Sequence, residues 1–412
     1  MKTIIETEEM LQAISESIDI SPAVFQQAVD HYTKLGDYLE QCEDGYPSVY
    51  VQGSFRLGTV IRPFRNGKDA EFDIDIVADK KCSKGIGAGG LKHDMKRCLE
   101  SSPVYSRLLS PKEGRRSWRL DYASTGVGDF HIDVLPCVPE EKKVIEEMLR
   151  NAETPQLVTF AVEIAHLDKK TGTYSWKHSN PDGYGRWFDS INEQFLKVAI
   201  PTQRERFVNN HVYASVAQIP RRAYRSSLQR VIQLLKRHRD CRFAGKAFYD
   251  DRPISIIITT LCCQIARDLA RSEMSVSEVL DVVVEELKRY RILLEKESYG
   301  NSSNDSSRGY IRVKDDGHWN IPNPVDPREN FADRWHENDN SKAIAFSQWI
   351  EWLVEDMKLL SKGKESGTNF RSLGLAFGED VIRKVYRNLE LNPVPMAQKI
   401  EPISRPYYDQ ER

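Results

Sequence analysis

The chain has 412 residues, of which 40% are hydrophobic and 29% charged; this composition excludes extensive disorder and suits two lobes or one domain with an appendage. The 59 basic residues are balanced by 61 acidic ones, so no global positive field is available to hold a long nucleic acid. The start, MKTIIETEEMLQAI, has no long apolar core, from which we expect no signal peptide, no membrane span and a cytoplasmic protein.

The first half of the chain predicts an α/β lobe. Residues 22 to 41 place apolar side chains at three- and four-residue steps, typical of an amphipathic helix with Ser21 as N-cap and Pro22 at its first position. Short segments with β-branched or alternating residues are expected to be strands of one sheet. These segments are residues 48 to 52, 72 to 78, 117 to 122 and 129 to 135.

The second half is expected to be nearly all helical. The polar stretch from Ser298 to Tyr310 is expected to be a mobile loop. We therefore predict a catalytic lobe over residues 1 to 200, a helical lobe over residues 201 to 412, and a ligand cleft between them. The predicted helices are residues 183 to 200, 224 to 239, 253 to 272, 276 to 294, 340 to 361 and 377 to 390.

A strand ends at Gly53 and Ser54 in VYVQGSFRLGT, so backbone N–H groups and the Ser54 hydroxyl can face an anion such as phosphate. Taken alone, most such pairs are simple turns. In EFDIDIV, alternation puts Asp73 and Asp75 on one face of a strand. Two adjacent carboxylates favour a hard divalent cation between them, although a solvated strand face is the commoner explanation of an isolated DxD pattern.

The segment FHIDV repeats this pattern with Asp133. Three carboxylates on neighbouring strands suit two cations, as two-metal phosphoryl displacement requires, and Asp133 is also placed to help deprotonate an attacking sugar hydroxyl. The order of the Gly-Ser turn, the DxD strand and this later strand is far less probable by chance than any one of them.

Together these residues resemble the polymerase-β-like nucleotidyltransferases, and more closely the bacterial cyclic-oligonucleotide synthases related to cyclic GMP-AMP synthase and oligoadenylate synthase, called CD-NTases. The closer resemblance also rests on WKHSNPDGYGRWF, LQRVIQLLKRHRD and IPNPVDPRENFADRW, and it extends from about residue 20 to residue 390. It implies an α+β fold: a mixed sheet with flanking helices, a helical C-terminal lobe, and an active site in the cleft between them. The linker between Ser54 and Asp73 is longer than expected for minimal members of the superfamily.

The resemblance implies that Gly53 and Ser54 hold a triphosphate. It makes Asp73, Asp75 and Asp133 the ligands of two Mg²⁺ ions, with Mn²⁺ as a substitute. It also places Lys236 and Ser255 near the phosphates; a lysine is a compact charge suited to polyphosphate, although a lysine in a basic helix is more often a surface residue. Asn180 and Asn323 are expected near a base or ribose, or else are turn residues, because Asn before Pro is a common turn signal.

The implied reaction joins ATP, GTP or both into a cyclic di- or oligonucleotide, with a cyclic GMP-AMP-like product favoured and pyrophosphate released. In the family such products are antiphage messengers read by a separate effector protein, and no long nucleic acid or membrane is required. The alternatives are a nucleotidyltransferase that modifies RNA or protein, such as a tailing enzyme or a toxin, and a nucleotide-sensing module without catalysis. The near-zero net charge counts modestly against a large RNA acceptor.

Two further groups are weighed. The seven cysteines are scattered and lack a CxxC pair, which predicts reduced thiols, and the spacing of His238, Cys241, Cys262 and Cys263 matches no common zinc site. A basic cluster is expected either to serve phosphates or nucleic acid or to form a solvated helix face. Its members are Arg221, Arg222, Arg225, Arg230, Lys236, Arg237 and Arg239.

Overall fold

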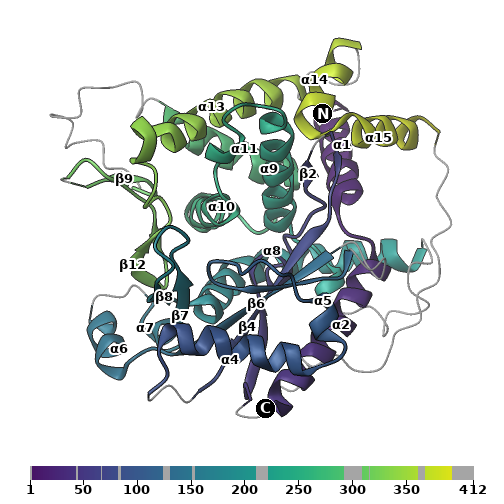
Figure 1. Cartoon of the computed structure of the whole chain (residues 1–412). Helices are drawn as coiled ribbons and strands as arrows, with labels where there is room; N and C mark the ends of the chain where they lie inside the picture. Colours follow the sequence, from purple (N-terminus) through teal and green to yellow (C-terminus); the bar gives the residue numbers. More distant parts are fainter. Residues whose placement is uncertain are drawn as a thin grey trace.

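The computed structural model combines one mixed sheet with a large group of helices (Figure 1). It describes residues 2–42, 45–65, 67–81, 85–123, 130–150, 154–209, 221–291, 309–314, 316–360 and 367–391. The predicted α+β fold class, a polymerase-β-like core with a helical lobe, is confirmed. The lobe boundary at residue 200 stays a prediction.

The main sheet has the order β1-β4-β6-β7-β8, and β5 pairs with β6. The central pair of strands, β4 and β6, is parallel, and the other pairs are antiparallel. The bounds of these strands are β1 Ser48–Gln52, β4 Phe72–Asp79, β5 Trp118–Asp121, β6 Phe130–Pro139, β7 Val162–Leu167 and β8 Tyr174–Ser179. Short hairpins add β2 Phe64–Arg65, β3 Lys68–Asp69, β9 Arg312–Val313, β10 Trp319–Asn320, β11 Pro322–Asn323 and β12 Asp326–Asn330.

One face of the sheet is covered by α2 (Pro22–Gln41) and α4 (Ala88–Ser101). The side chains of Phe72, Ile74 and Ile76 point into this core, so alternation along β4 turns Asp73 and Asp75 to the opposite face. Ser21 caps α2 by accepting a hydrogen bond from the backbone N–H of Val24 at 3.3 Å, as the sequence predicts. Packing of the apolar side chains against α2 and α4 therefore fixes the direction in which Asp73 and Asp75 point.

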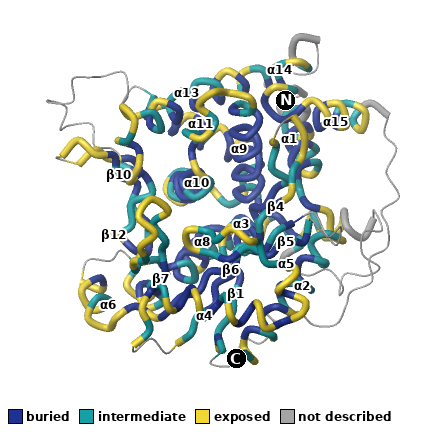
Figure 2. The backbone as a smooth tube through the Cα atoms, viewed as in Figure 1, coloured by how far each residue is buried: buried dark blue, intermediate teal, exposed yellow. Residues whose placement is uncertain are grey.

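The helical half surrounds α9 (Ser227–Phe243), which is buried along nearly its whole length (Figure 2). Helix α1 (Lys2–Ile18) packs on α9, α11 and α15, so the start of the chain lies in this helical core. The remaining longer helices are α8 Pro181–Asn209, α10 Ser255–Leu269, α11 Val276–Lys288, α13 Glu337–Leu360, α14 Gly367–Phe377 and α15 Glu379–Leu391. The short helices are α3 Gly53–Arg56, α5 Tyr105–Leu108, α6 Lys142–Leu149 and α7 Pro155–Val158.

All predicted helices and strands are present, and most of their ends differ by a few residues, although α8 continues nine residues beyond its predicted end at residue 200. The elements that were not predicted are α1, α4 to α7, α14, β2, β3 and β7 to β12. Most of the predicted loop from Ser298 to Tyr310 lies outside the described residues. The prediction of reduced thiols is wrong for one pair: α2 and α4 end side by side, with the Cα atoms of Cys42 and Cys98 6.1 Å apart, and these residues form a disulfide. Among the described residues, no helix is both long and apolar enough to cross a bilayer.

Candidate active site

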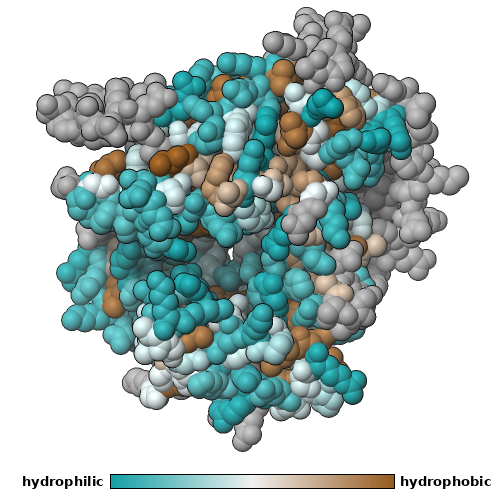
Figure 3. Space-filling view, turned by 45° about the horizontal axis from the view of Figure 1, so that its top comes forward, coloured by the Kyte–Doolittle hydropathy of each residue, from teal (hydrophilic) through white to brown (hydrophobic). Residues whose placement is uncertain are grey.

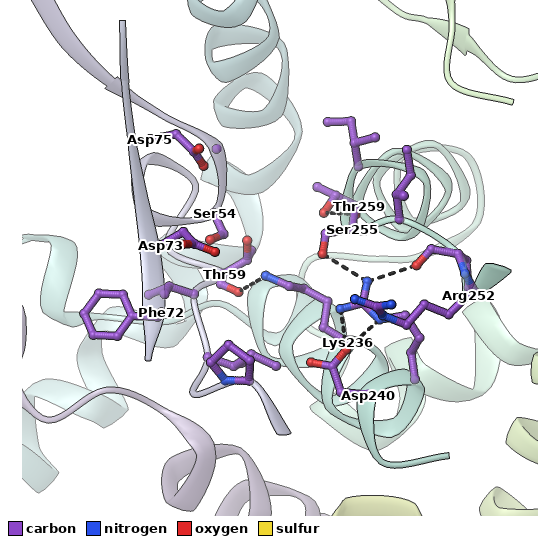
Figure 4. A pocket seen from close by; sticks show the side chains of 18 of the residues that line it. Ser54, Thr59, Phe72, Asp73, Asp75, Lys236, Asp240, Arg252, Ser255 and Thr259 are labelled. Carbon is purple, nitrogen blue, oxygen red and sulfur yellow. Dashed lines mark hydrogen bonds and ion pairs between the residues drawn. The ribbon is translucent and has the colours of Figure 1, made fainter. Parts of the chain in front are cut away.

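A cavity of about 550 Å³ lies between the acidic face of the sheet and the helical half. Its sheet-side wall contains Gly53, Ser54, Asp73 and Asp75, and its opposite wall comes mainly from α9 and α10 (Figure 4). The face of the molecule shown in Figure 3 is mainly hydrophilic and is hollowed near its centre. The predicted cleft is therefore a cavity with Asp73 and Asp75 on one wall and with Lys236 and Arg239, beside Asp240, on the other.

Gly53 begins α3 directly after β1, and its backbone φ of +64° lies in the left-handed region. A side-chain Cβ at this position would lie 2.6 Å from Oδ2 of Asp75. Both the conformation and the close approach require glycine. The absence of a side chain allows the loop to lie directly against Asp75, with Ser54 at the cavity.

Sheet register sets the acids in rows. Asp133 on β6 lies opposite Asp75 on β4 and, on its other side, opposite Arg119 on β5. Asp73 lies opposite His131, one step along the same face. Asp133 is therefore a neighbour of both cavity aspartates, although it is not itself among the residues that line the cavity.

The cavity aspartates hold protons more tightly than ordinary carboxyls do. Burial, together with the charges of Asp133 and Asp73, raises the pKa of Asp75 to about 7. Burial also raises the pKa of Asp73, against the opposing charge of Arg119. Carboxylates that repel one another in a partly buried site are suited to a divalent cation, and an all-oxygen donor set suits Mg²⁺.

Arg119 is a site residue that the sequence reasoning missed. Its Nε and Nη2 donate to the two carboxylate oxygens of Asp133 at 3.1 and 2.8 Å, and Nη2 also lies 3.1 Å from Oδ1 of Asp73. The hydrogen bonds to Asp133 raise the pKa of Arg119 above its ordinary value. The available signal was the arginine in SWRLDY, on a strand predicted in the same sheet as FHIDV.

Lys236 lies across the cavity from the acids (Figure 4). Burial and the nearby charge of Arg239 lower the pKa of Lys236 to about 7, and its Nζ donates to the carbonyl of Thr59 at 2.8 Å. Ser255, at the start of α10, lines the same cavity and accepts a hydrogen bond from Nη1 of Arg239 at 3.0 Å. Arg239, a member of the predicted basic cluster, also lines this wall, and so does Arg252, which was not predicted.

Helix α9 is joined to the loop after α3 by four side-chain bonds to main-chain carbonyls, which we call the α9 seam. The donors lie on one side of the helix, and the acceptors are nearly consecutive in the chain. The bonds run from Gln229 to Leu57 at 2.8 Å, Gln233 to Val60 at 2.9 Å, Lys236 to Thr59 at 2.8 Å and Arg237 to Arg62 at 3.0 Å. The phosphate-side loop and α9 thus form one continuous wall.

Asn180 and Asn323 are not among the residues that line the cavity. Asn180 donates to the carbonyls of Leu157 and Val325, and its Oδ1 accepts from the backbone of Gly183 at 3.0 Å. Asn323 accepts from the N–H of Val325 at 3.0 Å. Asn180 therefore caps the start of α8 and joins it to Val325, whereas Asn323 stabilises its own turn.

Most of the basic cluster is buried, so its helical part is not a solvated face. Arg221 is exposed and pairs with Glu193. Arg230 and Arg237 are buried and pair with Asp19 at 2.9 Å and Asp69 at 2.7 Å, respectively. Of the predicted cluster, Lys236 and Arg239 line the cavity. The zinc interpretation fails as expected: His238 bonds Asp356 and Trp349, and the thiols of Cys241, Cys262 and Cys263 are free and buried.

A second group of potential metal ligands lies away from the cavity, on adjacent strands. Ligand atoms of Glu140, Glu163 and His178 all lie within 4.8 Å of one another. Glu140 already contacts Nδ1 of His178 at 2.6 Å and Nη2 of Arg328 at 3.2 Å. The group was not predicted, because Glu140 lies just beyond its strand and β7 and β8 were not recognised.

Comparisons with known proteins agree with this geometry. The chain is 27% identical over 337 residues to a c-di-GMP synthase of Roseivirga ehrenbergii. The aligned region covers 80% of this chain and 73% of the relative. The chain is 24% identical over 370 residues to the cyclic dinucleotide synthase CdnG of Bradyrhizobium diazoefficiens, covering 86% and 76% of the two chains. No protein-family model matches the chain.

The solved structure of the Bradyrhizobium diazoefficiens CD-NTase CdnG in complex with GTP has the same fold. It superposes with a TM-score of 0.66 at 22% identity and covers 93% of this chain and 99% of that one. The predicted resemblance is confirmed: the chain is a nucleotidyltransferase related to the bacterial CD-NTases.

Proposed function

We propose that this protein is a divalent-cation-dependent synthase that joins purine nucleoside triphosphates into a cyclic di- or oligonucleotide and releases pyrophosphate. One observation carries the proposal: a single cavity has Ser54, Asp73 and Asp75 on one wall and Lys236 and Ser255 on the other. Such a cavity offers hydroxyls and an ammonium for phosphates beside carboxylates for cations.

Asp73, Asp75 and Asp133 are the proposed ligands of two Mg²⁺ ions, or of Mn²⁺. Bound there, the ions would neutralise the phosphates and lower the pKa of the attacking sugar hydroxyl. Lys236, on α9, supplies positive charge to the phosphates. Ser54, which follows Gly53 at the start of α3, donates a hydrogen bond to them from its hydroxyl. Asp133 is adjacent to Asp75 and is the proposed acceptor of the hydroxyl proton.

GTP is the substrate that the relatives favour. The family resemblance favoured a cyclic GMP-AMP-like product, whereas the Roseivirga relative is named a c-di-GMP synthase and the Bradyrhizobium structure contains GTP. Both products require guanine nucleotide. A cytoplasmic antiphage role, with a separate effector protein that reads the product, completes the proposal.

The test is incubation with all four nucleoside triphosphates and Mg²⁺ or Mn²⁺, then phosphatase treatment and mass spectrometry. We expect phosphatase-resistant cyclic products that contain guanine, made without added RNA. Linear products, or none, would contradict the cyclase proposal. Labelled RNA added in parallel tests the tailing alternative, which predicts extended RNA instead.

The cation site is tested with the double variant Asp73→Asn and Asp75→Asn. We expect no detectable product and an unchanged unfolding temperature, because the amides retain the shape of the side chains. Asp79→Asn, at the far end of β4, is the matched control and should retain activity. An active double variant would mean that the cations bind elsewhere. If the native protein binds nucleotide but shows no turnover, the sensing alternative is supported.

A further inference from the structure

Arg119 contacts two of the proposed cation ligands. An arginine side chain is positively charged and does not itself bind a metal cation. Arg119 lies opposite Asp133 in the antiparallel pair of β5 and β6. Its guanidinium contacts both oxygens of Asp133, and the same Nη2 that donates to Asp133 lies 3.1 Å from Asp73. One cationic group thus spans two of the three carboxylates.

A guanidinium is permanently charged and planar, so a two-point contact sets the direction of the carboxylate as well as neutralising it. The side chain of Arg119 is 41% exposed, whereas that of Asp133 is 15% exposed. Arg119 can therefore swing toward solvent without leaving its own charge buried, while Asp133 stays in place on its strand. This asymmetry makes the arginine the movable partner.

A divalent cation needs the same oxygen atoms that Arg119 engages. The positive charges repel each other at short range in a partly buried site, where effective dielectric constants are well below that of water. The guanidinium therefore opposes cation entry at Asp133 and Asp73. It also holds these two carboxylates close together against their mutual repulsion.

We propose that Arg119 is a positioning residue that orients Asp133 and competes with the divalent cation for Asp133 and Asp73. The inference rests on the proposed function in one respect, namely that these aspartates are cation ligands. Arg119 would then set how much divalent cation the protein needs before its carboxylates bind it. Removal of the guanidinium strengthens cation binding and impairs the orientation of Asp133.

The test measures Mn²⁺ binding by electron paramagnetic resonance, with and without a non-hydrolysable ATP analogue, in the full chain. Arg119→Met, which keeps the length of the side chain, should bind Mn²⁺ about tenfold more tightly. Arg119→Lys keeps the charge and should bind within about twofold of the native protein. Arg97→Met, which removes an exposed arginine on α4, controls for the change in net charge.

Turnover gives the second measurement. In Arg119→Met we expect kcat to fall, because Asp133 is no longer held, while the Mn²⁺ concentration for half-maximal rate also falls. Unchanged or weaker Mn²⁺ binding in Arg119→Met, in protein with a native unfolding transition, would overturn the inference. Mn²⁺ binding that follows the prediction in protein that makes no cyclic product would remove the cyclase function and support the role of Arg119. No Mn²⁺ binding in any variant would overturn both.

Discussion

β4 and α9 form opposite walls of one cavity, and they hold their charges in opposite ways. The aspartates of β4 lie side by side, where burial and mutual repulsion raise the pKa of both Asp73 and Asp75. The cations of α9 are separated and engaged with carbonyls or carboxylates, as Lys236 and Arg237 are. The carboxyls of β4 therefore line the cavity, where Arg119 contacts Asp73, whereas most of the helix's charges stabilise the fold.

This contrast assigns different consequences to charged residues on the two walls. Changes on β4 are expected to alter chemistry with little loss of stability. Changes on α9 are expected to do the reverse, with Lys236 as the exception, because it faces the cavity.

The largest expected effect comes from this exception. Lys236→Met should lower kcat/KM by about a hundredfold to a thousandfold, because a preorganised charge on the phosphates is lost. The free energy of unfolding should stay within about 1 kcal/mol of the native value, since the lost bond to Thr59 is offset by removal of a buried ammonium. Steady-state kinetics and urea denaturation measure the two, with Lys288→Met on α11 as control. A large loss of stability would show that Lys236 mainly stabilises the fold, as Arg237 does, and would contradict this prediction.

Arg237→Ala should have the largest effect on stability. Arg237 donates to Asp69 and to the carbonyls of Arg62 and Phe377, and its removal leaves these groups without their partner. We expect a loss of about 3 kcal/mol in the free energy of unfolding, measured by urea denaturation, because the carbonyls of Phe377 and Arg62 each lose a donor. The exposed Arg107→Ala should change it by less than about 0.5 kcal/mol. Equal effects of the two changes would contradict the distinction between the walls.

Cation binding should depend on pH through β4. With its pKa raised from 3.8 to about 7, Asp75 is mainly protonated below pH 7, and a cation must displace that proton. The apparent Mn²⁺ affinity should therefore fall about tenfold per pH unit below 7 and level off above it. Titrations from pH 5.5 to 8 measure this dependence, and Asp75→Asn should flatten it. A flat profile in the native protein would exclude Asp75 as the titrating ligand.

The smallest expected effect separates backbone strain from contact with the site. Gly53→Ala and Gly67→Ala both place a side chain at positive φ, +64° and +79°. Gly67→Ala should cost about 1 kcal/mol of stability, and Gly53→Ala should cost more because its Cβ would also lie 2.6 Å from Oδ2 of Asp75. Only at Gly53 does the new Cβ meet Asp75, since nothing lies within 4 Å at Gly67. Turnover should therefore fall in Gly53→Ala alone. Parallel denaturation and rate measurements on the two variants test this.

Local sequence pattern placed the aspartates of the sheet wall, whereas Lys236 and Ser255 on the helical wall were expected only from the family resemblance. Alternation in EFDIDIV assigns Asp73 and Asp75 to one face because a strand has a period of two, and the structure agrees. In α9 the charged residues predicted a solvated or ligand-binding face. Their acidic partners, Asp19 and Asp69, lie far away in the sequence, and no local pattern indicates such pairings.

Two further parts of the sheet lobe were not predicted: the strands β7 and β8, and the structure of the linker between Ser54 and Asp73. β7 and β8 form a hairpin at one end of the sheet, and β8 is a largely exposed strand whose apolar alternation is weak. The long linker between Ser54 and Asp73 contains the β2–β3 hairpin, and Arg237 stacks over Phe64 of that hairpin with its Cζ 4.7 Å from the ring centre. Long-range packing, which a single sequence does not display, decides these features.

The α9 seam implies an unequal tolerance of sequence drift on its two sides. Every residue has a carbonyl, so exchanging one loop residue for another leaves the acceptors of the seam intact. The donors are particular side chains, and a shorter or apolar replacement of Gln229 or Gln233 removes a bond outright. Diverged relatives that keep this wall should therefore vary more freely along the loop than at the matching helix positions. The seam therefore constrains which residues the helix can carry, but not which residues the loop carries.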